Sequence, residues 1–436
     1  MSNHLRSFTF AAGLIVALLA ASTAVLSTQS SATPTFSRDV APILYRNCVT
    51  CHRPGEIAPM SLLTYEQARP YARSIRERIE LGTMPPWHAE ASPGTFLNER
   101  RLTAAEKQTL ARWADNGAPQ GDPKDLPPVP VFIEGWTIGK PDAVVTMAEP
   151  YNVPASGEVE YQYISVPTNF AEDKWVQGIE IRPGVRSAVH HMLVFASDPG
   201  GAARPQQPFV QRNAEPAAPV AAQVGPAVVA ALLTGLRNAG SRRGPLIATT
   251  APGTNAVIFQ PGAALRIKAG SILTLQIHYT TTGKPEKDRS SVGFIFAKEP
   301  PKQEVRSSAF INLQLAIPPG ADNHRVDSQI EFTQDVHIVA LFPHTHLRGK
   351  SWEYRLTYPD GRDEVVLSVP HYDFNWQTYY EFARPLAVPK GSKLLAIAHY
   401  DNSANNKANP NPAVEVRWGD QTWEEMQYSG ITFTVD

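Results

Sequence analysis

Two thiols and an imidazole lie together near the start of the chain, in the segment Cys48-Val49-Thr50-Cys51-His52, and these are the chain's only cysteines. This CxxCH spacing is typical of covalent haem c attachment, because each thiol can add to one vinyl group and the adjacent histidine then lies beneath the iron. A redox dithiol would need a βαβ context, and a zinc site would need more cysteine or histidine nearby. The segment therefore predicts one covalent haem c, held by Cys48, Cys51 and His52.

The sixth ligand of the iron must come from elsewhere in the same small domain. Met84 follows residues 65–81, where Arg, Glu and Ile at helical spacing predict a helix, and it precedes two prolines that would make its loop rigid. A thioether ligand raises the reduction potential and suits electron transfer. Met60 and His88 are alternative ligands, and Met84 could also serve only in packing. We favour Met84, because the segment from 36 to 120, with its CHRPGEIAP and MPPWHA elements, resembles short bacterial cytochrome c domains.

Histidines recur in three places in the second part of the chain. His190 and His191 are adjacent, His278 ends the run LTLQIH, and His344 and His346 are two residues apart. Side chains two apart on a strand point to one face, so the last pair can chelate a metal. Adjacent residues point to opposite faces and could share a metal only at a bulge or a strand end. Each group taken alone could also be ordinary solvated histidine.

The order of four segments carries a family resemblance. HHM, LQIHYT, PHTHLRGK and EEM, taken in sequence, resemble the copper type II ascorbate-dependent monooxygenases, the family of peptidylglycine alpha-hydroxylating monooxygenase and dopamine beta-monooxygenase. The resemblance covers the chain from about Trp136 to the C-terminus. It implies two jelly-roll-like domains, each of which holds one copper ion across a solvent-filled cleft.

The resemblance also implies which residues bind each copper ion. By motif match, His190, His191 and His278 would hold the electron-storing copper. His344, His346 and Met426 would hold the catalytic copper. The ligand chemistry agrees, since imidazoles suit both oxidation states of copper and a thioether favours Cu(I), the state that binds dioxygen. The other histidines of the β region are expected to pack or to support the ligands: His324, His337, His371 and His399.

The chain departs from the family in three ways. Both of its cysteines belong to the CxxCH segment, so none is left to form the disulfides found in the animal enzymes. Phe342 stands where the peptide-amidating enzyme has a carboxylate-binding arginine. Tyr428 and Gly430 replace its polar substrate contacts. These differences argue against glycine-extended peptides as substrates, and nothing supports dopamine-like amines. Phe342 and Tyr428 favour an apolar or aromatic substrate.

The resemblance implies a copper-dependent monooxygenase that hydroxylates a C–H bond of a small organic substrate with dioxygen. The haem would pass on electrons from a separate redox partner, and a proline-rich tether would make that delivery intramolecular. The alternative is a haem and copper protein that transfers electrons or binds copper without oxygenase activity.

Length and composition limit the number of domains and the class of protein that carries these sites. The chain has 436 residues, enough for two or three domains at roughly 150 residues each. Its 40 basic and 41 acidic residues nearly cancel in charge, so the composition does not favour binding to nucleic acid. Residues 1–32 have Arg6 followed by an apolar run, Phe10 to Ala21, that is too short to span a bilayer. This pattern predicts a signal peptide and a periplasmic or secreted protein.

The sequence predicts a small all-α cytochrome c domain followed by two all-β, jelly-roll-like sandwich domains. The helical domain is expected at 33–122, where Thr103 and Glu106 form a capping box for a helix that ends at Gly117. A proline-rich linker, 123–135, leads to the first sandwich, 136–302, and the second follows at 303–436. Short alternating segments, such as 161–166, 175–181, 189–196, 272–279, 336–341 and 394–399, supply the expected strands. Residues 202–244 are expected to form a loop insertion in the first sandwich.

Overall fold

The computed structural model describes residues 33–56, 58–133, 135–201, 207–211, 244–251 and 256–435. The expected signal peptide and most of the expected insertion lie outside the described residues. Within the described ranges, no helix is long and apolar enough to cross a membrane.

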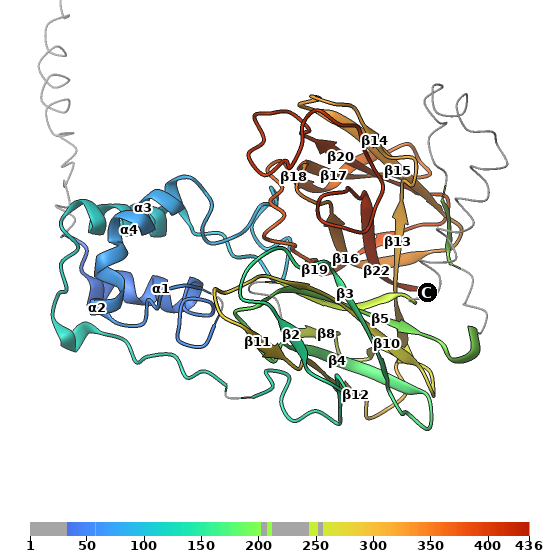
Figure 1. Cartoon of the computed structure of the whole chain (residues 1–436), viewed down its shortest axis with the longest axis horizontal. Helices are drawn as coiled ribbons and strands as arrows, with labels where there is room; N and C mark the ends of the chain where they lie inside the picture. Colours follow the sequence, from blue (N-terminus) through green and yellow to red (C-terminus); the bar gives the residue numbers. More distant parts are fainter. Residues whose placement is uncertain are drawn as a thin grey trace, which may run out of the picture.

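The described chain begins with a helical module, which lies beside the β region (Figure 1). Its elements are a π-helix at Phe36–Val40, α1 at Ala41–Asn47, α2 at Tyr65–Ala68, a 3₁₀ helix at Arg69–Tyr71, α3 at Ala72–Glu80 and α4 at Ala104–Asp115. Both hydrogen bonds of the predicted capping box of α4 are present: the Thr103 side chain accepts from the N–H of Glu106, and the Glu106 side chain accepts from the N–H of Thr103. The helical pattern of 65–81 is divided because Pro70, which lacks an N–H, stands in the short 3₁₀ turn. Phe36, Leu44 and Trp113 are buried at the centre of the module.

The β region contains the strands that the alternating segments predict. In its first part these are β1 (Ala143–Thr146), β2 (Tyr151–Val153), β3 (Gln162–Pro167), β4 (Lys174–Arg182), β5 (Val189–Ser197), β6 (Phe209–Gln211), β7 (Leu246–Thr250), β8 (Ala256–Ile258), β9 (Ala263–Ile267), β10 (Ile272–Tyr279), β11 (Glu286–Asp288) and β12 (Ser291–Phe296). In its second part they are β13 (Gln303–Ile311), β14 (Ala316–Ile317), β15 (His324–Phe332), β16 (Val336–His344), β17 (Gly349–Thr357), β18 (Asp363–Val369), β19 (Tyr380–Val388), β20 (Lys393–Tyr400), β21 (Val416–Arg417) and β22 (Tyr428–Val435).

One sheet extends through both halves of the β region. It is nine-stranded, runs in the order β1-β12-β4-β9-β13-β22-β16-β19, and has β8 paired to β4. The parallel pair β9–β13 joins its two halves. A four-stranded sheet, β3-β10-β5-β7, and a five-stranded sheet, β18-β17-β20-β15-β6, complete the two sandwiches. The sandwich class is as expected, but the sandwiches share a sheet, so their relative orientation is set by backbone hydrogen bonds.

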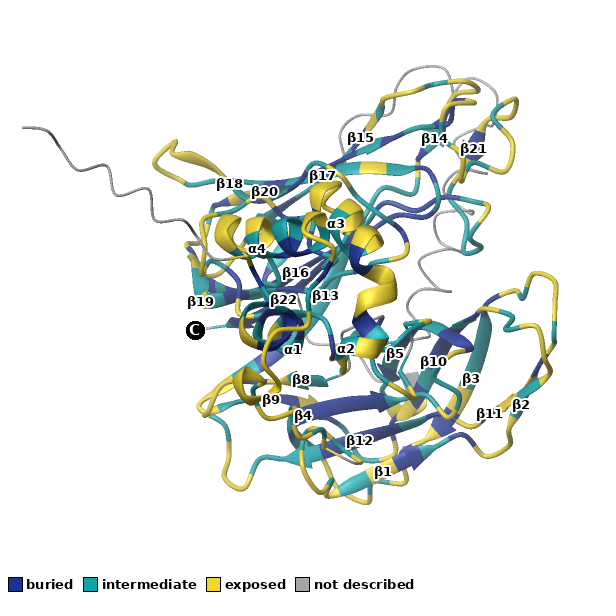
Figure 2. Cartoon of the chain, turned by 90° about the vertical axis from the view of Figure 1, so that its left-hand side faces the viewer, coloured by how far each residue is buried: buried dark blue, intermediate teal, exposed yellow. Residues whose placement is uncertain are grey.

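Each sandwich has its own apolar core. Ile179, Met192 and Leu275 are among the buried residues of the first, and Leu341, Tyr354 and Phe433 among those of the second. Figure 2 shows buried residues along β4 and β12, whereas the helices carry a wide exposed face.

The segment after α3 packs against the second sandwich. Trp87 and Phe96 belong to the apolar core of that sandwich, and the Phe96 ring lies 5.2 Å from the ring of Phe382. Backbone bridges pair Glu90 with Ser368 and Phe96 with Phe382. Residues 87–98, which we name the strap, therefore fasten the helical module to the second sandwich. The sequence had predicted these residues as part of the haem domain alone.

Candidate metal centres

The first histidine group lies where β5 and β10 pair. His278 lies opposite His191, but the next pairing joins Tyr279 to Val189, so His190 is an extra residue at a bulge. The bulge lets both adjacent imidazoles turn to one side of the sheet. The sequence had required a bulge or a strand end for these two residues to share a metal, and the structure has one.

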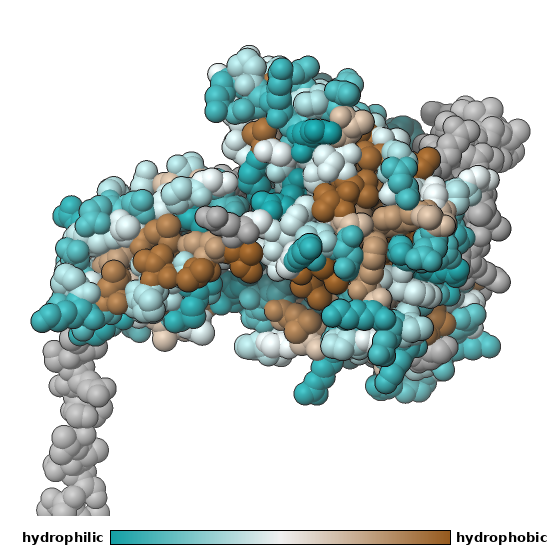
Figure 3. All heavy atoms as spheres, turned by 90° about the horizontal axis from the view of Figure 1, so that it is seen from below, coloured by the Kyte–Doolittle hydropathy of each residue, from teal (hydrophilic) through white to brown (hydrophobic). Residues whose placement is uncertain are grey.

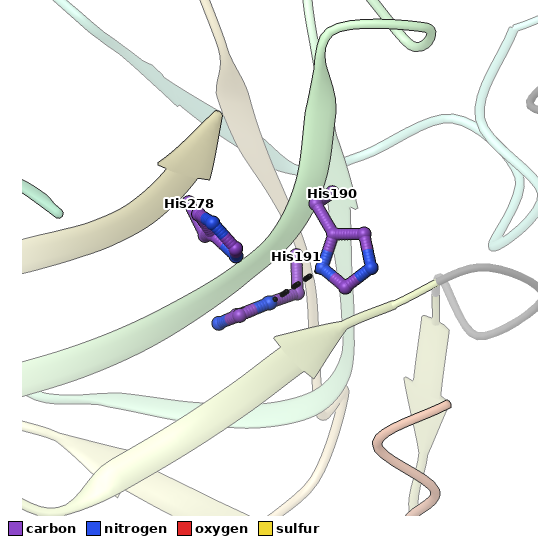
Figure 4. A group of neighbouring side chains, drawn as sticks. All are labelled: His190, His191 and His278. Atoms are coloured by element: carbon purple, nitrogen blue, oxygen red, sulfur yellow. Dashed lines mark hydrogen bonds between the residues drawn. The ribbon is translucent and has the colours of Figure 1, made fainter. Parts of the chain in front are cut away.

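The three imidazoles of this group converge, as Figure 4 shows. Their candidate ligand nitrogens all lie within 4.8 Å of one another. The Nδ1 atoms of His190 and His191 are 3.0 Å apart. Nδ1 of His278 is buried and has no hydrogen-bond partner among the described residues. Buried polar atoms are normally paired, so this convergence fits a cation held by three imidazoles.

Burial keeps these imidazoles neutral. Desolvation lowers the pKa of His278 to about 3, and it also lowers the pKa values of His190 and His191. A neutral imidazole has a lone pair to offer, whereas a protonated one cannot bind a metal. The first group is therefore ready to bind a metal at neutral pH.

The second group lies at the end of β16. His344 is the last residue of that strand, His346 follows in the turn, and their ring centroids are 5.2 Å apart. Nδ1 of His344 donates to Oε1 of Gln377 (2.8 Å), and Nδ1 of His346 donates to the backbone carbonyl of Glu424 (3.2 Å). Both Nε2 atoms then keep a lone pair, which is how hydrogen bonds orient metal-binding histidines. Nε2 of His346 is buried and unpaired among the described residues, and burial lowers the pKa of His344 to about 4.

A buried carboxylate ties this turn to Met426. Glu425 accepts hydrogen bonds from the backbone N–H groups of His346 (2.8 Å), Arg348 (2.7 Å) and Met426 (3.2 Å). Burial raises the pKa of Glu425 to about 7. Glu425 is 79 residues from His346 along the chain. Because its side chain binds the backbone N–H groups of both His346 and Met426, it brings these two residues to one place.

A cavity of about 890 Å³ opens beside the second group. Its lining includes His344, His346, Met426 and Tyr428, apolar residues of β5, β7 and β9, and charged residues such as Arg266, Lys268 and Glu304. The three histidines of the first group are not among its described lining residues. This cavity adjoins the second group only, and the expected solvent-filled cleft between the two groups stays a prediction.

Side chains fill the space between the two groups. The Tyr161 ring lies 4.9 Å from the ring of His278 and 6.3 Å from that of His346. The Phe374 ring is 6.0 Å from the rings of both His191 and His346. Gln377 contacts His344 and also His191, with 3.3 Å between its Nε2 and Nδ1 of His191. Sequence reasoning missed these residues, since no spacing or motif marks them.

The CxxCH segment lies in the turn after α1. Both thiols are free, and burial raises the pKa of the Cys48 thiol to about 12. Nδ1 of His52 donates to the backbone carbonyl of Met60 (3.3 Å), which leaves Nε2 available to a metal. Hydrophobic residues are visible on the face of the helical part of the chain seen in Figure 3. The donor set fits a haem; Met84, whose backbone N–H donates to Arg78 (3.3 Å), stays a prediction as sixth ligand.

The CxxCH loop contacts the loop that leads to the first histidine group. Oε2 of Glu56 lies 3.3 Å from Nε of Arg186, and Glu56 also pairs with Arg53 (2.8 Å). Arg186 precedes His190 by four residues in the loop between β4 and β5. The helical module thus contacts the first sandwich as well as the second.

Comparison with known proteins gives one family match. Residues 311–426 match the family model described as copper type II ascorbate-dependent monooxygenase, C-terminal domain. The matched range contains His344 and His346 and ends at Met426. No curated protein matches the chain.

The chain is also similar to several solved structures. The major capsid protein P2 of bacteriophage PM2 is 9% identical with a TM-score of 0.29, and the match covers 67% of this chain and 97% of that one. A putative secreted protein from Eubacterium rectale is 8% identical with a TM-score of 0.19, over 63% of this chain and 69% of that one. These TM-scores are too low to relate the folds or the functions.

Proposed function

We propose that the protein is a copper-dependent monooxygenase that hydroxylates a C–H bond of a small organic substrate. The observation that carries this proposal is the cavity at the second histidine group, because its lining residues His344, His346 and Met426 lie within the range that matches the family model. A second group of three converging imidazoles supports it.

The residues present fit two copper ions. His190, His191 and His278 would hold one, and His344, His346 and Met426 the other. Copper would supply one-electron redox chemistry and dioxygen activation, which the side chains of the chain lack. The overall reaction takes a C–H substrate, dioxygen, two electrons and two protons to an alcohol and water.

The chain's own residues would hold the substrate and shape the site. Apolar residues of β5, β7 and β9 in the cavity lining would contact the substrate, and Tyr428 would position it beside His344. The Phe342 ring is stacked against His344, with 6.0 Å between centroids, and so fixes the orientation of that imidazole. The Glu425 carboxylate would keep His346 and Met426 at one site.

We propose further that a haem c on Cys48, Cys51 and His52, with Met84 as sixth ligand, is part of the enzyme. Such a haem would supply one-electron transfer. Two observations support this assignment: the orientation of the His52 ring and the Glu56–Arg186 contact, which puts the CxxCH loop beside the loop that leads to His190. Electron donation within one chain would be faster than collision with a separate donor.

The compartment and the donor follow from the same proposal. Covalent haem attachment and the pattern of residues 1–32 both favour a periplasmic or secreted protein. A separate redox protein or small reductant would deliver electrons to the haem.

The test is a metal and product analysis of the full-length protein. Protein produced with haem maturation and loaded with copper should contain about two copper ions per haem, and each dioxygen consumed should give one hydroxylated product. A protein with haem but no copper contradicts the proposal. Oxygen consumption without an organic product, across a broad screen of small substrates, would instead favour an electron-transfer protein without oxygenase activity.

A further inference from the structure

The cavity beside the second histidine group is elongated, because strands that lead away from that group form its walls. Ile311 of β13 pairs with Tyr428, and Tyr428 pairs with His344, so these three residues lie in one row at the metal end. Val305 lines the cavity at the other end of the same strand. At about 3.3 Å per residue, the wall from Ile311 to Val305 is about 20 Å long.

A second wall leads away from the histidines in the same manner. β5 runs from His191 through Leu193 and Phe195 to Asp198, which follows the strand, and the last three of these residues line the cavity. His191, Leu193 and Phe195 are spaced two apart and so share one face of the strand. Between its two ends the cavity therefore has apolar side chains from both β5 and β13.

The metal end of the cavity is acidic. Asp420 and Glu424 belong to its lining. Glu424 lies two residues before Met426, and its backbone carbonyl accepts from Nδ1 of His346. Two acidic side chains disfavour a carboxylate at this end, whereas an apolar group can contact Met426 and Tyr428.

The other end of the cavity carries basic side chains. Lys268 pairs with Asp198 (2.5 Å), and the NH2 group of Arg306 pairs with Glu304 (3.0 Å). Nε of Arg306 is buried and has no hydrogen-bond partner among the described residues, although the side chain as a whole is 27% exposed. A buried N–H without a partner is costly, so this donor fits an acceptor that a ligand brings.

We propose that the cavity binds linear carboxylates with a long apolar chain, the chemistry of a medium-chain fatty acid. The carboxylate accepts from Nε of Arg306, and the chain extends along β13 and β5 so that its methyl end lies beside His346 and Met426. The volume of about 890 Å³ is within the range of small-molecule sites. For the role of this ligand as substrate, the inference rests on the proposed function, and it assigns the reaction to C–H bonds remote from the carboxylate.

The test compares ligands that share one chain and differ in the charge of the head group: decanoate, decanol and decyltrimethylammonium. Binding is measured by calorimetry on the full-length protein as purified, without oxygen, so that no turnover occurs. Decanoate should bind about 10-fold more tightly than decanol, because its charged head makes the stronger hydrogen bond to Arg306, and the cation should bind most weakly. Butanoate, which keeps the head group but loses most of the chain, should bind at least about 100-fold more weakly than decanoate.

Two substitutions at the basic end should act in opposite directions. Arg306→Gln should weaken decanoate binding by about 10-fold, because the charge and the Nε donor are lost. Glu304→Gln should tighten it, because Arg306 then has no acidic partner at this position to compete with the ligand. Decanol should respond much less to either change. Arg325→Gln is the matched control and should leave decanoate binding unchanged: Arg325 also pairs with an acid two residues away on its strand, Asp327 (2.7 Å), and is not among the described lining residues.

The outcomes separate this inference from the proposed function. If Arg306→Gln and Glu304→Gln both weaken decanoate binding, the pair is only structural, and the inference is overturned. It is also overturned if neither variant changes the affinity, or if the cation binds most tightly. The expected charge pattern in a protein that binds no copper would support the inference and contradict the proposed function. Hydroxylation of another substrate by a protein whose decanoate affinity ignores both substitutions would overturn the inference alone.

Discussion

Arg186 and Glu56 form an ion pair, with 3.3 Å between Nε and Oε2, across the boundary between the helical module and the first sandwich. Both side chains are 19% exposed, so solvent screens the pair only partly. The pair joins the loop after CxxCH to the loop before His190. It is therefore one contact that holds the CxxCH loop beside the loop that leads to the first histidine group.

Glu56→Gln should slow electron transfer from haem to copper while leaving haem content and copper content unchanged. A partly exposed ion pair contributes only about 1 kcal/mol, so the protein should stay folded. The measurement is the rate of haem reoxidation after anaerobic reduction and mixing with oxygen. Glu286→Gln, which removes the remote pair with Lys284, is the control. An unchanged rate in Glu56→Gln would show that this contact has no part in electron delivery.

Met426→Leu should abolish hydroxylation and leave the haem absorption spectrum unaltered. Leucine conserves the volume of methionine but lacks the sulfur, so packing is retained and one ligand is lost. Product formation and the spectrum are measured on the same sample. His399→Ala is the control and should keep its activity, because this half-buried histidine of β20 lies 3.3 Å from the hydroxyl of Ser351 and is not among the proposed ligands. Full turnover in Met426→Leu would remove this residue from the site.

Glu425→Gln should lower the free energy of unfolding by about 1–3 kcal/mol, because an amide NH₂ would face backbone N–H groups that now donate to a carboxylate. Cu(I) affinity at the second centre should fall with it, since the backbone of both His346 and Met426 is held by this side chain. Urea unfolding and chelator competition give the two values. The exposed Glu415→Gln serves as the control, and equal behaviour of the two variants would contradict the anchoring role.

Phe96→Ala should destabilise the protein by about 3–5 kcal/mol, the usual effect of truncating a buried aromatic residue. Phe96 is 3% exposed in the core of the second sandwich, whereas the next residue, Leu97, is 56% exposed. Leu97→Ala should therefore change stability by less than about 0.5 kcal/mol. Denaturant unfolding of the two variants tests whether the strap is part of that core or lies loosely on it.

Peptides that end in glycine should not be hydroxylated. Phe342, which stands where the peptide-amidating enzyme has a carboxylate-binding arginine, is 1% exposed and stacked against His344. It offers no positive charge to a terminal carboxylate. A screen of glycine-extended peptides with the copper-loaded enzyme checks this, and turnover of any such peptide would refute it.

Much of the local structure could be predicted from the residues alone. The capping box of α4, the strand limits of β10 and the need for a bulge at His190 all depend on neighbours within a few positions, where backbone geometry and hydrogen bonding act directly. The division of 65–81 was missed because a single proline outweighed the helical pattern around it. The match of residues 311–426 to the family model supports the metal-binding motifs of the second sandwich.

The amino-acid sequence by itself determined the chemical inventory of this protein: the donor atoms, their order along the chain and the elements that carry them. Only the tertiary structure decided which of these atoms meet and what lies between them. Gln377, Tyr161 and Phe374 reach the histidines because separate strands and loops converge there, and the strap joins the second core because aromatic rings from distant segments exclude water together. Such contacts depend on the packing of whole layers, and that packing leaves no local period or motif in the sequence.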